Sequence, residues 1–166
     1  MYILIDSRER KHAITHIEKA FERRGVKYST CKLFCADYAI PTNMNVVVDR
    51  KMNLNELVNN VTREHERFRA EMIRAQEAGI KIIFLCEHGH GIKNLADVAG
   101  WTNPRALERR KVDGRWQTVH KKVMHGETLC KILMTMERKY GVQFLFCDKD
   151  ETGDRIIDLL SERRNI

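Results

Sequence analysis

The 166-residue sequence is poor in proline and has no long hydrophobic run. With two prolines and no stretch rich in glycine or serine, nothing in it marks a linker between domains. No segment approaches the ~18 consecutive apolar residues of a membrane span, and the N-terminus begins an apolar strand without the pattern of a signal peptide. These absences predict one domain over residues 1–166, no membrane association and a cytoplasmic location.

The cysteines do not form a recognisable pattern. There are five, an odd number, and no two stand in a C-x-x-C pair. Most lie in or beside apolar stretches, which predicts buried free thiols in a reducing compartment and disfavours zinc. His88 and His90 lack the further ligands of a tetrahedral site, so a polar loop is the better interpretation there. We expect no organic cofactor. The cysteines are Cys31, Cys35, Cys86, Cys130 and Cys147.

Negative charge is outnumbered by positive charge. The chain has 30 lysines and arginines against 23 aspartates and glutamates, a net charge of +7, and its sequence pI is near 9.3. Such an excess favours an anionic partner, and nucleic acid is the commonest one.

Apolar periodicity divides the chain into strands and helices. Continuous apolar strands covered by helices are typical of an α/β sandwich around a mixed sheet. Connections within residues 26–51 are too short for crossover helices, so an antiparallel meander is expected there. The predicted strands are 2–5, 26–34, a short one opening at Asp37, 46–51, 80–86 and 142–147. The predicted helices are one of about a dozen residues before Gly25, one from Asn53 to about 78, a short one near Leu95, one beginning at 102–104, and those at 127–140 and 154–163.

The helix after Asn53 has a plausible capping box, because Glu56 follows Asn53 by three residues. Its predicted buried stripe consists of Leu54, Leu57, Val58, Val61, His65, Phe68 and Met72. In the helix at 127–140, Met134 and Met136 are expected to pack, and the apolar face is available either for the core or for a homodimer.

The stretch from Asp37 to Lys51 combines an acid, a turn-rich spacer and the run Val46–Val48. Three β-branched residues predict a buried strand, on which Asp49 and Lys51 share a face. With a second acid nearby, these groups suit Mg²⁺ beside a nucleophilic water, which the lysine positions or deprotonates. For D-x-K taken alone, a surface ion pair at a strand end is the better explanation, so the choice depends on the motifs that accompany it.

Four motifs occur in an informative order: IDSRE at residues 5–9, Asp37-Tyr38, VVVDRK at 46–51, and a helix with Arg67-Phe68 and Glu71. In this order they resemble the XPF/Hef-type nuclease domain, a branch of the PD-(D/E)XK, restriction-endonuclease-like superfamily. The resemblance covers residues 1 to about 90, and residues 95–166 look like a shorter phage-type or bacterial variant that completes the fold.

This resemblance implies a restriction-endonuclease-like three-layer sandwich, with a central mixed sheet flanked by helices. It also implies a metal-dependent DNA endonuclease that uses Mg²⁺, with Mn²⁺ able to substitute, in a bacterial or phage-infected cell and associated with the nucleoid. Branched or otherwise structured DNA in repair, recombination or phage DNA processing would be its substrate, and a homodimer is possible.

Site residues carry over from the matching motifs. The resemblance implies metal ligation by Asp37 and Asp49, with Lys51 at the attacking water and Asp6 as a further acidic member, acting directly or through water. Flanking residues would contact DNA or order the site. Arg63, Arg67 and Glu71 are each four residues apart, which predicts that they share one helix face, and a structural ion-pair ladder explains that spacing equally well. These flanking residues are Arg8, Glu9, Arg63, Arg67 and Glu71.

The sequence departs from the family pattern at three positions. Ala36 replaces the usual glycine before the acid, Asp49 replaces a glutamate, and Asn55 stands where an acid is expected four residues after the lysine. The tandem helix-hairpin-helix domain of many relatives is not within these residues, so the preferred DNA structure stays open.

Residues 105–122 carry seven basic residues against two acidic ones, a net charge of +5. Asp113-Gly114 is a turn signal, which predicts a basic hairpin or loop. Such a segment could hold a phosphate backbone and stack Trp116 on an unpaired base, or it could be a solvated surface loop. Its candidate DNA-binding residues are Arg109, Arg110, Lys111, Arg115 and Trp116.

Two other functions remain open from the residues alone. One is a non-catalytic DNA-binding or scaffold module on the same fold, against which the joint presence of Asp37, Asp49 and Lys51 argues. The other is an RNA-cleaving enzyme with the same site.

Overall fold

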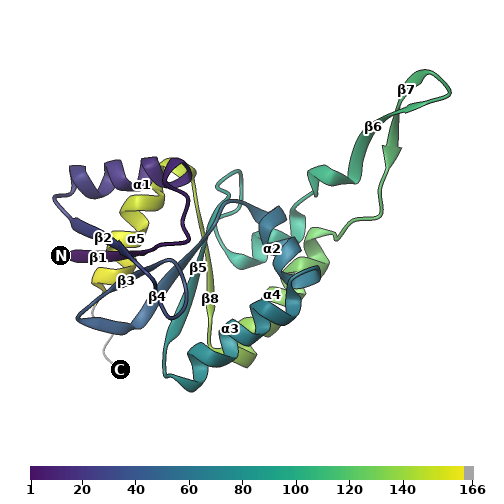
Figure 1. Cartoon of the computed structure of the whole chain (residues 1–166). Coiled ribbons are helices and arrows are strands. Elements are labelled where there is room, and N and C mark those ends of the chain that lie inside the picture. The colour runs from purple at the N-terminus through teal and green to yellow at the C-terminus, as the bar shows by residue number, and fades with distance from the viewer. Residues whose placement is uncertain (163–166) are drawn as a thin grey trace.

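The computed structural model describes residues 1–162, and a six-stranded mixed sheet forms its centre (Figure 1). The strand order is β2-β1-β3-β4-β5-β8. β1 runs parallel to β2 and antiparallel to β3, β3 and β4 are antiparallel, and β4, β5 and β8 are parallel. The strands are β1 (Tyr2–Asp6), β2 (Lys27–Cys31), β3 (Tyr38–Ile40), β4 (Asn43–Lys51), β5 (Lys81–Glu87) and β8 (Gln143–Cys147).

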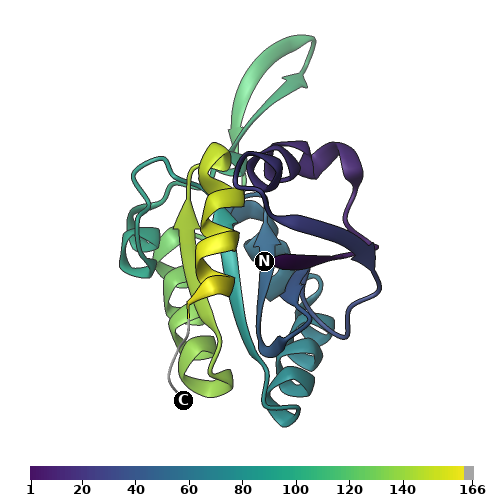
Figure 2. The same ribbon diagram turned by 90° about the vertical axis from the view of Figure 1, so that its left-hand side faces the viewer.

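Helices cover both faces of this sheet, giving the expected three layers (Figures 1 and 2). α1 and α5 pack together on one face, and α2, α3 and α4 cover the other. The α-helices are α1 (Lys11–Arg23), α2 (Leu54–Thr62), α3 (His65–Glu77), α4 (Gly126–Tyr140) and α5 (Thr152–Ser161). Three short 3-10 helices are η1 (Leu95–Gly100), η2 (Pro104–Ala106) and η3 (Lys149–Glu151).

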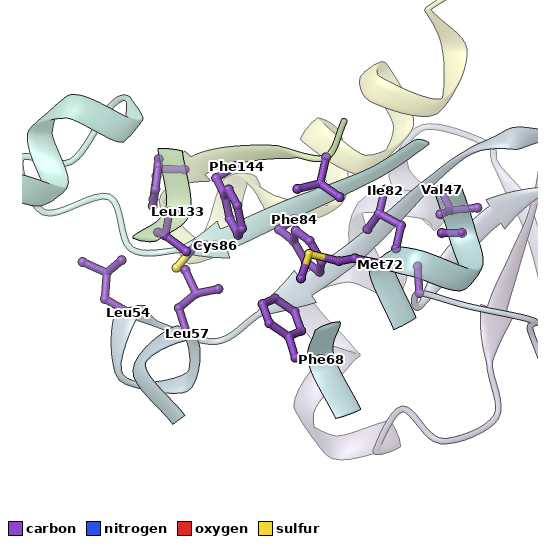
Figure 3. Close-up of a cluster of buried hydrophobic side chains, with 14 of the residues drawn as sticks. Val47, Leu54, Leu57, Phe68, Met72, Ile82, Phe84, Cys86, Leu133 and Phe144 are labelled. Atoms are coloured by element: carbon purple, nitrogen blue, oxygen red, sulfur yellow. The ribbon is translucent and has the colours of Figure 1, made fainter. Parts of the chain in front are cut away.

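Alternation along the central strands divides the apolar residues between two cores. On β4, Val47 packs with α2 and α3, whereas Val48 packs with α1 and α5. β5 alternates in the same way, with Ile82 on the first side and Ile83 on the second. Figure 3 shows the first core, in which the ring of Phe84 lies 5.0 Å from that of Phe68 and 5.0 Å from that of Phe144, measured between centroids.

The antiparallel meander is confirmed only in part. β3 and β4 pair as expected, but β2 lies at the sheet edge parallel to β1 rather than beside β3. α1 provides the crossover between β1 and β2, which lets the two strands run in the same direction.

The single helix expected after Asn53 is wrong, because the chain breaks into α2 and α3 at Arg63-Glu64. Every residue from 62 to 67 is polar, so no apolar side chain fixes a straight helix to the core there. His65, expected in the buried stripe, is exposed, and α3 starts a new approach to the sheet with Phe68 and Met72.

Asn103-Pro104 does not begin a long helix. Only the one-turn η2 forms, after which β6 (Leu107–Val112) and β7 (Arg115–His120) build a separate two-stranded hairpin. Asp113 and Gly114 both have positive φ, 49° and 78°, as a two-residue type I′ turn requires. The predicted hairpin is therefore confirmed.

Two further expectations concern α4 and α5. Leu129 and Leu133 pack in the core, but Met134 is exposed, which corrects its expected packing, and Met136 is only partly buried. The predicted end of the last helix at Arg163 lies outside the described residues. Within residues 1–162 all cysteines are free, and no helix has the length and apolarity needed to cross a membrane.

Candidate active site

A polar cleft of about 180 Å³ opens at the end of β4, where the sheet meets α2 and α3. Its walls come from the β1–α1 turn, the loop before β3, β4 and the two helices. The lining residues are Arg8, Glu9, Ala36, Asp37, Asp49, Arg50, Lys51, Glu56, Asn60, Arg67, Phe68 and Glu71. The cleft thus brings together half of the site residues predicted from the sequence, including Asp37, Asp49 and Lys51.

Asp49 and Lys51 share a face of β4, as the alternation predicted. Lys51 Nζ lies 2.6 Å from Asp49 Oδ1 and 5.4 Å from the ring centroids of both Phe68 and Phe84. Asp49 is 5% exposed and Lys51 8%. The pair is therefore held against the aromatic core, which rules out a simple surface ion pair.

Burial and neighbouring charges set the protonation of this pair. Burial raises the pKa of Asp49 to about 6, with Lys51 opposing the rise and Glu71 adding to it. Burial lowers the pKa of Lys51, but the charges of Asp49 and Asp37 outweigh this and raise it above its ordinary value. Lys51 is consequently an ammonium at neutral pH, suited to donating a hydrogen bond rather than to removing a proton.

Asp37 reaches the cleft from a tightly fixed loop. Ala36 has φ of 60°, the left-handed conformation that glycine adopts most easily, and its N–H donates to Glu71 Oε1 at 3.2 Å. Asp37 Oδ2 accepts from the backbone N–H of Arg50 at 2.8 Å. Burial, followed by the charges of Asp49 and Glu9, raises the pKa of Asp37 well above its ordinary value.

Arg50 points to the opposite face of β4 and anchors it. Its guanidinium donates to Glu9 Oε2 at 3.0 and 3.2 Å and to Glu87 Oε2 at 3.2 Å. Glu87 Oε1 lies 2.6 Å from His16 Nε2 on α1. The residue between Asp49 and Lys51 thus links β4 to the α1 layer.

Asp6 does not line the cleft. Both carboxylate oxygens accept hydrogen bonds: Oδ1 from Arg8 N and Nε, and Oδ2 from Arg8 Nη2 and Leu33 N. Burial raises the pKa of Asp6, but these bonds prevail and lower it. The contacts make Asp6 an orienting group for Arg8, and Arg8 itself lines the cleft.

The expected flanking residues separate into two places. Arg67 and Glu71 lie on α3 at the cleft, whereas Arg63 caps the C-terminus of α2 and lines a different groove. The prediction that all three share one helix face is wrong, because the helix breaks between Arg63 and Arg67. Arg67 pairs with Glu64, also on the exposed side of this break.

Two cleft residues were missed by the sequence interpretation. Glu56 Oε1 lies 4.0 Å from Lys51 Nζ, so a carboxylate does stand beside the lysine although position 55 is asparagine. Asn60 is buried, and its Oδ1 has no hydrogen-bond partner within the described chain. Glu56 and Asn60 are four residues apart on the helix that begins after the cap Asn53, so they share one helix face. This spacing was the signal that could have identified them.

The carboxylates fit a divalent cation, although the three expected ligands do not converge. Asp49 Oδ1 is buried and has no hydrogen-bond partner within the described residues. Lys51 Nζ lies close to it, but the geometry is that of an ion pair and not of a hydrogen bond. Burial is the main cause of the raised pKa of both Asp37 and Asp49, and a neighbouring carboxylate adds to each, so a bound cation would favour their ionised forms. No group of three or more potential ligands is arranged around one point in residues 1–162. Two carboxylates with substrate oxygens match how proteins usually hold Mg²⁺.

The predicted DNA-binding residues of the basic segment lie apart from the cleft. Arg109, Arg110, Lys111, Arg115 and Trp116 are all on the β6–β7 hairpin, which projects from the body of the molecule (Figure 1). The hairpin joins the body near the C-terminal end of α2, where Arg105 Nη1 donates to Asn59 Oδ1 at 3.4 Å.

The mixed sheet between helical layers, with a D-x-K pair at the end of the central strand β4, has the same fold as solved XPF structures. Residues 5–159 match the family model described as "ERCC4 domain", and the chain belongs to that family. No curated protein sequence matches it.

Two solved structures share the fold. "XPF from Aeropyrum pernix" has a TM-score of 0.65 at 17% identity, with 99% of this chain and 66% of that chain covered. "XPF from Aeropyrum pernix, complex with DNA" has a TM-score of 0.61 at 17% identity, covering 96% and 62%. The present chain thus spans less than two thirds of the length of these relatives.

Proposed function

We propose that this protein is a metal-dependent endonuclease that hydrolyses phosphodiester bonds in structured DNA. The observation that carries the proposal is the cleft in which Asp37, Asp49 and Lys51 meet. Family membership supports nuclease chemistry, and one of the two similar XPF structures is a complex with DNA. A net charge of +7 supports an anionic polymer as substrate.

Each cleft residue then has a distinct task. Asp37 and Asp49 hold the cation, whose chemistry is to offset negative charge on the phosphate and to lower the pKa of water. The Lys51 ammonium donates a hydrogen bond to the attacking water or to a phosphate oxygen, where negative charge develops. Arg8 and Arg67, both at the rim, contact the DNA backbone, and Arg8 is oriented for this by Asp6.

A scaffold module that binds DNA without cutting it is the rival on the same fold. The buried, unsolvated Asp49–Lys51 pair argues against it, since burying two charges costs free energy that a scaffold has no reason to retain. Cleavage of RNA by the same site is the second rival, and substrate comparison separates the two.

The test is cleavage of labelled branched and linear DNA, with a matching RNA, in Mg²⁺, Mn²⁺ or EDTA. Wild type is expected to cut DNA only with a metal. Asp49→Ala and Lys51→Ala should each lower the rate at least ~100-fold, as loss of a group that stabilises the transition state does. Lys19→Ala, on the exposed face of α1, is the matched control and should cut normally.

Binding measured on the same DNAs completes the test. Retained binding by the two cleft variants would place their defect in the chemical step. Wild type that binds every DNA and cuts none under any metal would support the scaffold instead, and faster cutting of RNA would assign the site to that polymer.

A further inference from the structure

The β6–β7 hairpin exposes its side chains without a core to support them. None of its residues is buried, and its two strands pair only with each other (Figures 1 and 2). A two-stranded hairpin has little stability of its own in water, so this one depends on its register and its tight Asp113-Gly114 turn. A projecting, well-registered ribbon is a form that enters nucleic-acid grooves.

One face of the hairpin combines an aromatic ring with cations. Lys111 stands opposite Trp116, and Arg109 lies two residues from Lys111 on the same face. Trp116 is 64% exposed and lines a shallow hollow with Arg109. Neither cation forms an ion pair with any residue from 1 to 162. An open indole beside unpaired cations is chemically complementary to an unpaired base with its flanking phosphates.

The opposite face adds further positive charge. Arg110 and Arg115 lie there, also without an ion-pair partner in the described chain. The acidic residues of the hairpin do not oppose this charge at the ring, because Glu108 pairs with Lys121 at the base and Asp113 is in the turn. This charge favours DNA over a protein partner.

A groove with several basic residues lies at the base of the hairpin. It lies between the end of α2 and the hairpin base and is lined in part by Arg63, Arg105, Lys121 and Lys122. α2 begins three residues after Lys51, and its nine residues span about 14 Å. From the start of β6 at Leu107 to Lys111, which lies opposite Trp116, five strand residues span about 16 Å. Laid end to end, the two lengths total about 30 Å, which is close to one turn of duplex DNA.

We propose that the hairpin locates a branch in DNA: Trp116 stacks on an unpaired base while Arg109 and Lys111 hold the adjacent phosphates. The proposal rests on the nuclease function proposed above. It specifies the substrate as duplex DNA interrupted by unpaired bases within about one helical turn of the cut.

Binding without metal tests this inference separately from cleavage. Fluorescence anisotropy in EDTA compares a fork with unpaired arms and a duplex of the same sequence. Wild type is expected to prefer the fork. Trp116→Ala should weaken fork binding about 10-fold or more with little change for the duplex, whereas Trp116→Phe should retain the preference.

Charge variants separate stacking from phosphate contact. Arg109→Gln with Lys111→Gln should weaken binding to both DNAs and flatten the dependence of log K on log salt by about two. Lys19→Gln, the matched control on α1, should change neither. The proposal is overturned if Trp116→Ala still prefers the fork to the duplex. It is also overturned if wild type shows no preference for the fork. Tighter binding of single-stranded RNA that Trp116→Ala abolishes overturns it as well.

Cleavage adds an outcome that depends on both proposals. With metal, Trp116→Ala should still cut, but at positions spread more widely from the branch than in wild type. Asp49→Ala should cut nothing while keeping the fork preference. If wild type prefers forks but never cuts, only the nuclease proposal is overturned. If Trp116→Ala cuts as close to the branch as wild type does, only the proposed role of the hairpin is overturned.

Discussion

The raised pKa of Asp49 makes the stability of the protein and its response to metal depend on pH in a definite direction. Its pKa is about 6 in the folded chain against 3.8 ordinarily, so the folded state holds this proton more tightly than the unfolded state. Stability through this group is greatest below pH 4 and falls as pH rises towards 6 and above. The full difference is about 3 kcal/mol, at 1.36 kcal/mol per pKa unit.

A divalent cation should reverse this loss, since it binds the ionised form. At pH 5 only about one tenth of Asp49 is ionised, so apparent metal affinity should be about 10-fold weaker than at pH 7.5. The raised pKa of Asp37 acts in the same direction. Stabilisation by Mn²⁺ should therefore be small at pH 5 and large at pH 7.5.

Urea unfolding between pH 4 and 7.5, with EDTA or Mn²⁺, measures both effects. Asp49→Asn should flatten the pH dependence and lose the stabilisation by metal. For Asp49→Asn, the quantity to compare is the slope of the unfolding free energy with pH and not its absolute value. The absolute value also falls because asparagine leaves the Lys51 ammonium with weaker partners. Asp150→Asn, an exposed aspartate, is the control. Equal stabilisation by Mn²⁺ at both pH values would refute the assignment of Asp49 as a ligand.

Two further variants test the supports of the cleft. Ala36→Gly should raise the free energy of unfolding by about 1 kcal/mol in thermal or urea melts and leave cleavage unchanged, because glycine adopts φ of 60° more easily; a loss of stability would show that the methyl group of Ala36 contributes more than its strain costs. Arg50→Ala should destabilise by about 3–5 kcal/mol, since it leaves Glu9 and Glu87 without their cation. If urea melts show less than about 1 kcal/mol for Arg50→Ala, the network does not anchor β4.

The sequence predicted the parts of this site that depend on local periodicity. Val46–Val48 required a strand, and alternation then fixed Asp49 and Lys51 on one face and Arg50 on the other. The turn signal Asp113-Gly114 likewise predicted the hairpin. Fold class followed from the order of these elements and from the resemblance to a known nuclease domain.

What the sequence left undetermined depends on tertiary contacts. The break at Arg63-Glu64 was missed because His65 completed a helical stripe by its spacing, whereas in the fold His65 is exposed. Asp6 was grouped with the other acids because the IDSRE motif matches the nuclease family, but Arg8 and Leu33 N satisfy its carboxylate. Glu56 entered the cleft only because α2 starts directly after β4.

Arg50 connects the cleft to α1, which covers the opposite face of the sheet. Through Glu87 it connects β4 to His16, so α1, which does not line the cleft, limits how far β4 can shift. Because thermodynamic coupling is reciprocal, a ligand whose binding depends on this network should also raise the free energy of opening of α1. In hydrogen exchange, amides on the back of the molecule would thus report on occupation of its front.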